Sequence, residues 1–223
     1  MRRIGALQRL SHTLSVHARQ RRGDNLKFKM AEAERKHGLE KTAYEYWYDS
    51  LWQSFHEPSP ERFLALIPHV GSQLDPIASK FRRSAIGTLP DKAGSRRIFP
   101  GSCFVQDGLI SLWHFVREYI NYPSVVSASV MHYGICVLHP FSDGNGRLAR
   151  ILFNVLIYRG NSRNYIPLRQ IFNASDFGYE IRLHEMDDTQ CWEKLIWFFH
   201  DLLLSYDRIY RKALHPRETL IFS

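Results

Sequence analysis

The residues that could do chemistry lie together in the segment HPFSDGNGRLAR, residues 139–150. His139 has an ordinary pKa near 6.5, so its imidazole can accept a proton at neutral pH. Asp143 offers a hard oxygen of the kind that binds Mg²⁺ together with substrate phosphates. A base and a metal-binding carboxylate this close together indicate chemistry on a phosphate-containing substrate.

The glycines and arginines of the same segment favour an anion. Gly144 and Gly146 flank Asn145, and they leave N–H groups uncovered where a helix begins and where its dipole attracts negative charge. Arg147 and Arg150 lie three residues apart and share a face of the first turns, where a cation is unfavourable unless an anion is close. The segment therefore predicts a binding site for phosphate groups.

Each of these residues also has an ordinary structural role to play. Asp143 or Asn145 could cap the helix, the glycines could form a turn, and His139 could be a hydrogen-bonded core residue. We favour a functional site because a base, a carboxylate, a glycine-flanked helix start and two arginines occur within twelve residues.

Two apolar helices must hold the segment in place. The first is expected over residues 125–138, and it should end at His139 because a residue before proline is disfavoured in the α conformation. The second is expected over residues 146–158 and should turn one apolar face to the core. The buried positions of that face are Leu148, Ile151, Leu152, Val155 and Leu156.

Helical periodicity dominates the rest of the chain as well. Large aromatic and apolar residues recur at spacings of three and four over residues 42–55. Further helices are expected over residues 108–120, near 176–185 and over 192–206. The turn-rich residues 87–101 interrupt this pattern, and short segments on either side could pair as a β-hairpin. The expected fold class is therefore all-α.

The chain is expected to have four parts. They are a basic tail over residues 1–23, a helical extension over 24–60, one catalytic domain over 61–213 and a C-terminal tail over 214–223. The net charge is +8, but six of the 30 Lys and Arg and none of the 22 Asp and Glu lie in residues 1–22. The nearly neutral remainder argues against a nucleic-acid or membrane partner. A frayed terminus is favoured for the basic start, with a mitochondrial presequence as the alternative.

Composition excludes several classes of protein. With 44% hydrophobic and 23% charged residues, the 223-residue chain is an ordinary globular protein and not disordered, collagenous or coiled-coil. No apolar run predicts a transmembrane helix, and no secretory signal is evident. Three widely spaced cysteines without a CxxC pair indicate free thiols in a reducing compartment. A cytoplasmic location is expected.

The segment 139–150 resembles the Fic family pattern HPFx(D/E)GNGRxxR and matches every specified position. Weaker similarity extends over residues 81–205. Fic proteins that resemble this chain transfer AMP from ATP to a hydroxyl side chain of a target protein. The resemblance therefore implies a protein adenylyltransferase, built as an all-α Fic-type helical bundle with a small β-hairpin flap before the motif helix.

The resemblance also implies a role for each matched residue. His139 would be the general base, Asp143 would bind Mg²⁺, and Phe141 would anchor the loop in the core. The ATP-binding residues would be Gly144, Asn145, Gly146, Arg147, Leu148, Arg150 and Tyr179, with the two arginines on the terminal phosphates. His132 also fits a common family position, with packing as its role.

Partners follow from the same resemblance. Residues 84–99 would form a flap against which an extended segment of the target, bearing a Ser, Thr or Tyr hydroxyl, pairs by main-chain hydrogen bonds. The inhibitory pattern (S/T)xxxE(G/N) is missing, since no glutamate here is followed by Gly or Asn. This implies control by a separate antitoxin-like inhibitory protein, or no such control.

Two other functions compete with AMP transfer. One is phosphate transfer of the death-on-curing type, whose proteins carry a lysine where this chain has Gly146. The other is a catalytically silent module that binds nucleotide, which need not keep His139, Asp143 and both arginines. The complete motif favours AMP transfer, and the oligomeric state stays open.

Overall fold

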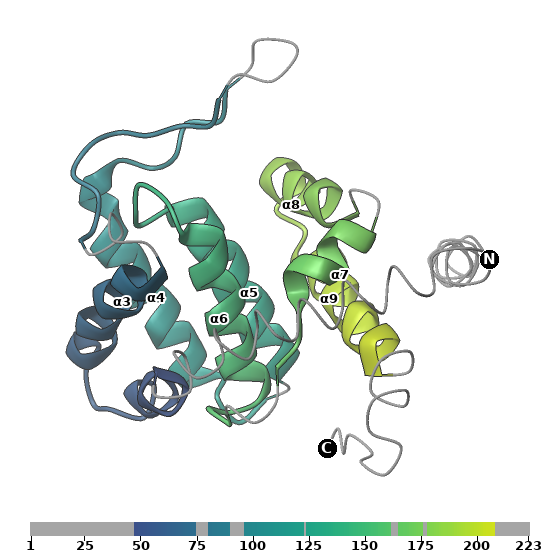
Figure 1. Cartoon of the computed structure of the whole chain (residues 1–223), viewed down its shortest axis with the longest axis horizontal. Coiled ribbons are helices and arrows are strands. Elements are labelled where there is room, and N and C mark those ends of the chain that lie inside the picture. Colours follow the sequence, from purple (N-terminus) through teal and green to yellow (C-terminus); the bar gives the residue numbers. More distant parts are fainter. Residues whose placement is uncertain are drawn as a thin grey trace. The chain divides into compact units, whose positions relative to one another are not determined.

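The computed structural model describes residues 47–74, 80–89, 96–122, 124–161, 165–175 and 178–207. The basic tail, the first part of the predicted extension and the C-terminal tail lie outside these residues. Residues 47–54 are helical, and so are α3 (Glu61–Leu74), α4 (Val105–Glu118), α5 (Ser124–Leu138), α6 (Asn145–Ile157), α7 (Leu168–Ala174), α8 (Gly178–Thr189) and α9 (Trp192–Tyr206) (Figure 1). No strand occurs in the described parts of the chain, and the all-α class is confirmed.

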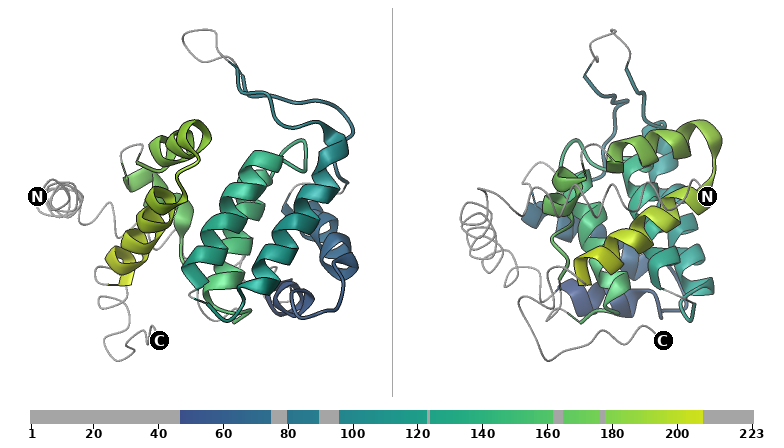
Figure 2. Two further views of the ribbon diagram at one scale, coloured as in Figure 1. Left: turned by 180° about the vertical axis from the view of Figure 1, so that it is seen from behind. Right: turned by 90° about the vertical axis from the view of Figure 1, so that its right-hand side faces the viewer.

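The chain divides into two compact units, one over residues 43–165 and one that includes residues 166–207. In the first unit α5 packs along α6, with α4 against α5 and α3 against both α4 and α6 (Figure 2). The helices expected over 125–138 and 146–158 begin and end within one residue of their predicted bounds. All five predicted core positions of α6 are buried, so its predicted apolar face is confirmed.

Residues 47–54 and α3 line the other side of α4. Trp113 of α4 is fully buried and donates its indole N–H to the carbonyl oxygen of Ser54 at 2.8 Å. The rings of Phe55 and Phe63 lie 5.2 Å apart and join the end of the first helical segment to α3. Sequence periodicity did not predict α3, which contains a proline, Pro68, in its interior. These contacts hold residues 47–54 and α3 against α4. In turn α4 packs against α5, and α3 packs against α6.

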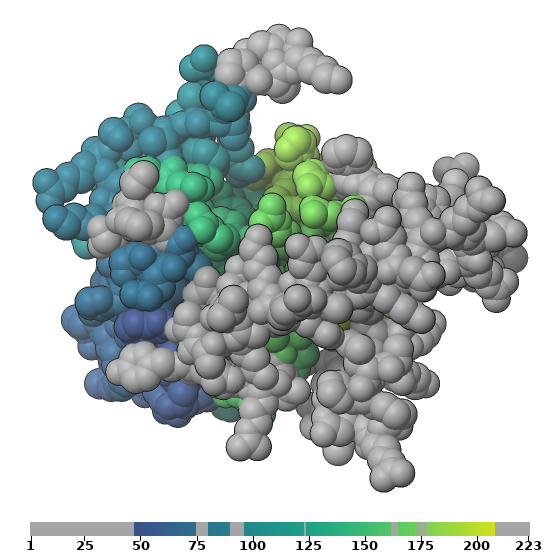
Figure 3. All heavy atoms as spheres, viewed as in Figure 1, coloured from purple at the N-terminus to yellow at the C-terminus, as the bar shows by residue number. Residues whose placement is uncertain are grey.

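Residues 84–89 and 96–99 form two arms (Figure 1), and this part of the chain projects from the first unit (Figure 3). The arms meet at one antiparallel bridge between Gly87 and Ile98. Thr88 donates its N–H to the Arg97 carbonyl oxygen at 2.9 Å, and Phe99 donates to Ile86 at 3.1 Å. Residues 90–95, where the turn of the expected hairpin falls, lie outside the described residues.

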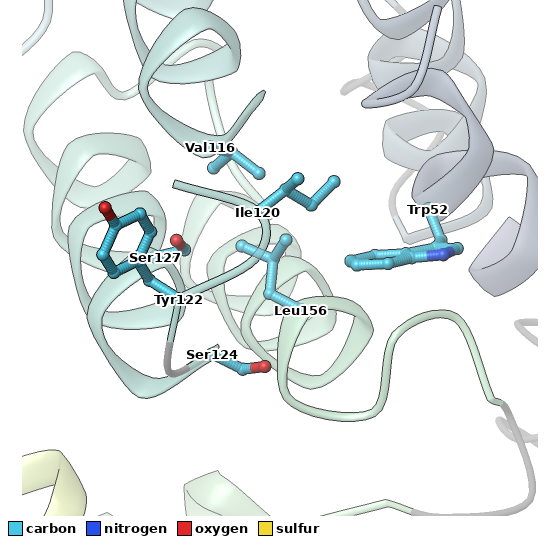
Figure 4. Close-up of a pocket in the computed structure, with 7 residues that line it drawn as sticks. All are labelled: Trp52, Val116, Ile120, Tyr122, Ser124, Ser127 and Leu156. Carbon is cyan, nitrogen blue, oxygen red and sulfur yellow. The ribbon is translucent and has the colours of Figure 1, made fainter. Parts of the chain in front are cut away.

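A small pocket lies at the end of α5 and α6 that is remote from the motif (Figure 4). It is lined by Trp52, Val116, Ile120, Tyr122, Ser124, Ser127 and Leu156. Ser124 begins α5 and Leu156 lies in the last turn of α6, whereas residues 139–144 join the opposite ends of the two helices. At 1.5 Å per residue, α5 separates the pocket from the motif by roughly 20 Å. The pocket is not part of the predicted site.

The second unit consists of α7, α8 and α9. Phe172 of α7 stacks on Tyr179 of α8 with ring centroids 3.9 Å apart, and it meets Phe199 of α9 edge-on at 6.0 Å. The helix α9 has its predicted bounds, α8 ends four residues beyond the prediction, and α7 was not predicted. No helix in the described residues is long and apolar enough to cross a membrane.

Trp113→Phe should destabilise the first unit because it removes the indole N–H that donates to the Ser54 carbonyl and leaves a void. The free energy of unfolding should fall by about 2 kcal/mol or more. Trp197→Phe is the matched control, since Trp197 is 54% exposed and its loss should cost less than about 0.5 kcal/mol. Urea denaturation followed by circular dichroism measures both, and equal effects would contradict the packing described.

Candidate functional site

Asn145 closes the loop that joins α5 to α6. Its side-chain oxygen accepts the Phe141 N–H at 2.9 Å, and its side-chain N–H₂ donates to the Phe141 carbonyl oxygen at 2.9 Å. An asparagine can do this because its amide carries a donor and an acceptor side by side. Asn145 is only 2% exposed, so its side chain is a buried part of the loop and holds its conformation.

Phe141 anchors the same loop in the core, as expected. Its ring is fully buried and stacks on Phe81 with centroids 5.9 Å apart. With the aromatic anchor on one side and the Asn145 pairing on the other, the loop has little freedom to change its path. The groups at its rim are therefore held in defined places.

Gly144 and Asp143 form the start of α6. Gly144 is the N-cap residue with φ 83°, a left-handed conformation that a side chain would strain. Its N–H donates to the Asp143 carboxylate at 2.6 Å. The first hydrogen bond within the helix runs from the Leu148 N–H to the Gly144 carbonyl oxygen at 2.9 Å. The N–H groups of Asn145 and Gly146 precede it and have no partner within the helix, which makes this end suitable for an anion.

The two motif arginines differ in what they contact. Arg147 donates to the carbonyl oxygen of Leu74, the last residue of α3, and lies 3.5 Å from the Asp143 carboxylate. Arg150 reaches back over the helix start, where its Nη1 lies 3.3 Å from the place that a Cβ of Gly146 would take. The structure thus brings Arg150 to the anion-favouring end of α6. Leu148 is fully buried, so its side chain belongs to the core.

His139 follows the end of α5 in an unusual backbone conformation, and two contacts hold its ring. Its φ is 48°, in the left-handed region. The imidazole stacks on Phe99 with ring centroids 3.8 Å apart, and Nδ1 lies 3.4 Å from the Cys136 carbonyl oxygen. A hydrogen bond to this carbonyl oxygen requires the proton on Nδ1, and in the neutral ring that tautomer leaves the lone pair on Nε2. Nε2 is the atom that can take a proton from a substrate.

The surroundings lower the pKa of His139 below its ordinary value. Burial is the largest cause, and it is opposed by the Cys136 carbonyl, which favours the protonated ring. The positive charges of Arg82 and Arg97 lower the pKa further, whereas Asp143 raises it. The imidazole is consequently neutral at pH 7, the state that a general base requires.

His132 lies two turns earlier in α5 and has the packing role expected of it. It is fully buried and meets Phe153 edge-on at 6.1 Å. Burial, and secondarily the charge of Arg150, lower its pKa to about 3. His132 is therefore a neutral core residue.

Sequence reasoning missed two residues that hold His139. Arg82 is 5% exposed and donates to the carbonyl oxygen of His139 at 2.7 Å, and Phe99 supplies the ring on which the imidazole stacks. Both lie about 40 to 60 residues before the motif. Arg82 is followed by an exposed arginine, and no feature of the sequence separates a buried cation from a solvated pair.

The donor set at the site is compatible with Mg²⁺. Asp143 is the carboxylate of the loop, its side chain is 73% exposed, and the described residues contain no cluster of three potential ligands. A single carboxylate fits Mg²⁺, which takes its remaining ligands from phosphate oxygens and water. Tyr179 belongs to the second unit, so its contact with a nucleotide stays a prediction.

Sequence and structure both relate this chain to known proteins. The Fic/DOC family model matches residues 81–157. The protein adenylyltransferase Fic of Aedes aegypti is 33% identical over 90 residues, which are 39% of this chain and 17% of that protein. Its counterpart in Drosophila willistoni is 32% identical over 133 residues, 57% of this chain and 25% of that protein. The chain spans a quarter or less of the length of these relatives.

Two solved structures share the fold. A Fic family protein from Desulfovibrio desulfuricans G20 superposes with a TM-score of 0.54 at 12% identity, over 98% of this chain and 76% of that one. Fic-1 from C. elegans superposes with a TM-score of 0.50 at 20% identity, over 77% of this chain and 51% of that one. The Fic resemblance inferred from the motif is confirmed.

Titration of the histidines tests the electrostatics of the site. The His139 signal should change with a midpoint below the ordinary 6.5, and its Nδ1 should carry the proton of the neutral form. His132, with a pKa of about 3, should stay neutral throughout the range in which His139 titrates. Two-dimensional ¹H–¹⁵N NMR of the imidazole rings measures both, and a His139 midpoint above 6.5 would refute the lowered pKa.

Proposed function

We propose, starting from the Fic/DOC family segment over residues 81–157, that this chain transfers AMP from ATP to a hydroxyl side chain of a target protein. One observation carries the proposal: His139, at the exit of α5, is joined by a short loop to a glycine-rich helix start over which the Arg150 guanidinium lies. The adenylyltransferase name of the curated relatives supports the same reaction.

The reaction follows from these groups. Nε2 of His139 takes the proton of the target hydroxyl while that oxygen attacks the α-phosphorus of ATP. The bond between the α-phosphorus and its oxygen bridge to the β-phosphate breaks, and pyrophosphate leaves. The N–H groups of Asn145 and Gly146 would hold phosphate oxygens, and Arg147 and Arg150 would hold the terminal phosphates. Positioning and fixed charge supply most of the rate.

Arg147 would have to change partners to reach a phosphate. It now donates to the Leu74 carbonyl, a neutral acceptor, and lies beside Asp143. A phosphate oxygen is a stronger acceptor for a guanidinium because both partners are then charged. Asp143 would hold Mg²⁺, which supplies charge neutralisation on the phosphates, and the exposure of this carboxylate leaves it open to do so.

The flap and the adenine contact complete the proposal. We infer that residues 84–99 form a β-hairpin on which an extended segment of the target pairs, and the Gly87–Ile98 bridge supports this. We place Tyr179 at the adenine base. We further infer a catalytic domain over residues 61–213, a cytoplasmic location, a Ser, Thr or Tyr hydroxyl on the target, and a separate antitoxin-like inhibitor.

Phosphate transfer of the death-on-curing type is less compatible with the site. Its proteins carry a lysine at the position of Gly146, and here the Arg150 guanidinium occupies the space over that glycine. A lysine at this position would place its Cβ 3.3 Å from Arg150 Nη1 and a second positive charge beside that guanidinium. A silent nucleotide-binding module is the remaining alternative, and a transfer assay separates it from both enzymes.

Labelled ATP distinguishes the three functions. With Mg²⁺ and a lysate that contains targets, ATP labelled at the α-phosphate should label protein, and ATP labelled at the γ-phosphate should not. Phosphate transfer predicts the reverse pattern. Binding of ATP without either label on protein, repeated in lysates from several hosts, would support the silent module. Gel autoradiography and intact-mass analysis are the measurements.

Two substitutions should separate proton transfer from nucleotide binding. His139→Ala should lower kcat by about 10²- to 10⁴-fold and leave ATP affinity unchanged, because the imidazole acts on a proton. Arg150→Ala should instead weaken ATP binding, since it removes a charge-assisted contact to phosphate. Transfer kinetics and calorimetric titration with ATP measure the two effects.

The matched controls for these variants are His114→Ala and Arg169→Ala. His114 is an exposed residue of α4, and Arg169 is an exposed residue of α7. Both controls should keep the activity and the ATP affinity of the unaltered chain. Full transfer by His139→Ala would eliminate the general base, and unchanged ATP affinity in Arg150→Ala would eliminate the phosphate contact.

A further inference from the structure

The turn at His139 needs outside support to exist. Its φ of 48° is uncommon for a residue with a side chain, and the proline that follows disfavours most conformations other than an extended one. A backbone in such a region persists only where surrounding contacts over-determine it. The imidazole follows this backbone, so whatever holds the turn also aims the base.

Arg82 supplies that support from a segment far away in the sequence. Its Nε–H donates to the carbonyl oxygen of His139 at 2.7 Å, and its Nη2 donates to that of Leu138 at 3.1 Å. The backbone N–H of Arg82 donates to the Pro140 carbonyl oxygen at 2.9 Å. Three consecutive carbonyl groups at the exit of α5 are thus held by one residue.

The same guanidinium also holds the base of the flap arms. Nη1 donates to the carbonyl oxygen of Ser84 at 2.9 Å, and Nη2 donates to that of Pro100. These residues stand at the two ends of the segment that leaves and re-enters the first unit. Phe99, the neighbour of Pro100, presents its ring to His139. Arg82 therefore holds both the ends of the flap arms and the turn that carries His139.

Arg82 acts here through the geometry of its hydrogen bonds and not through an ion pair. Arg82 is 5% exposed, and none of the ion pairs between described residues includes it. All the acceptors of its guanidinium are backbone carbonyls, which a planar fork with five donors can reach in several directions at once. A lysine ammonium is a single point with three donors and cannot reproduce this set.

We propose that Arg82 is the positioning residue that orients His139 and ties it to the base of the flap. The catalytic consequence rests on the proposed function, whereas the orientation of the ring does not. A target segment that pairs with the flap would meet a base already aligned with it. Without the Arg82 guanidinium, the turn at His139 should lose its supporting hydrogen bonds, and the imidazole should no longer stay stacked on the Phe99 ring.

The first experiment observes His139 without any substrate. Arg82→Lys and Arg82→Met should move the ring signals of His139 away from their stacked values in NMR spectra. Arg82→Met should also raise the His139 titration midpoint, because the Arg82 charge lowers that pKa, and Arg82→Lys should raise it less. Arg97 and Asp143, the other charged groups that act on His139, are unchanged in both variants.

Arg83→Lys and Arg83→Met are the matched controls. Arg83 is the next residue, its side chain is exposed, and its carbonyl oxygen accepts from Ser102, a contact that neither change removes. Both controls should leave the His139 signals in place. Unaltered His139 signals in Arg82→Lys, or equal changes in the Arg83 variants, would overturn the proposal.

Kinetics add the catalytic consequence. Arg82→Lys should lower kcat by about 100-fold with unchanged ATP affinity, the effect of a misplaced catalytic group. Full kcat in this variant would overturn the positioning role. If the unaltered chain transfers no label to any protein, the proposed function fails, and the NMR result still decides the orientation of His139.

A measurement on the unaltered chain guards against variants that do not fold. Four donated hydrogen bonds should make the Arg82 Nε–H exchange slowly with solvent and hinder rotation of its guanidinium. Arg83 in the same spectrum should exchange and rotate rapidly. If the Arg82 side chain proved as mobile as that of Arg83, the proposed positioning of His139 by Arg82 would be refuted without any substitution.

Discussion

The packing of α5 against α6 is the contact on which the rest of the site depends. Because the two helices lie side by side and are joined by residues 139–144, the end of α5 and the start of α6 must meet. This places a histidine from one helix exit next to the N–H groups of the other helix start. His139 and a helix start whose dipole favours an anion come together without any long connection, and an apolar interface holds the distance between them.

Buried polar groups turn that packing into a defined loop. Asn145 pairs with both backbone groups of Phe141, and Arg82 satisfies the carbonyls of the α5 exit. Buried backbone groups without partners would be costly, so these side chains decide which loop conformation is stable. The same burial keeps His139 neutral. Burial of Phe141 and Asn145 fixes the path of the loop, and partial burial of His139 lowers the pKa of its imidazole.

Three arginines show how context sets the role of one residue type. Arg82 is buried and donates to backbone carbonyls, Arg147 reaches the end of α3, and Arg150 lies over the glycine at the start of α6. Arg150 has its guanidinium at the start of α6, the end that favours an anion. Under the proposed function Arg147 would have to leave the neutral Leu74 carbonyl for a phosphate, which would couple ATP binding to the contact between α6 and α3.

The sequence by itself determined the all-α class, the bounds of α5, α6 and α9 and the content of the motif, because periodicity, proline and glycine act locally. It did not predict α3, although the buried residues Phe63, Ile67, Val70 and Leu74 recur at spacings of three and four across Pro68, or α7, which is too short for periodicity. The tertiary structure alone decided the left-handed His139, its Phe99 stack and the hydrogen bonds of Arg82 to the exit of α5. These depend on contacts between residues up to 57 positions apart, and no local pattern encodes them.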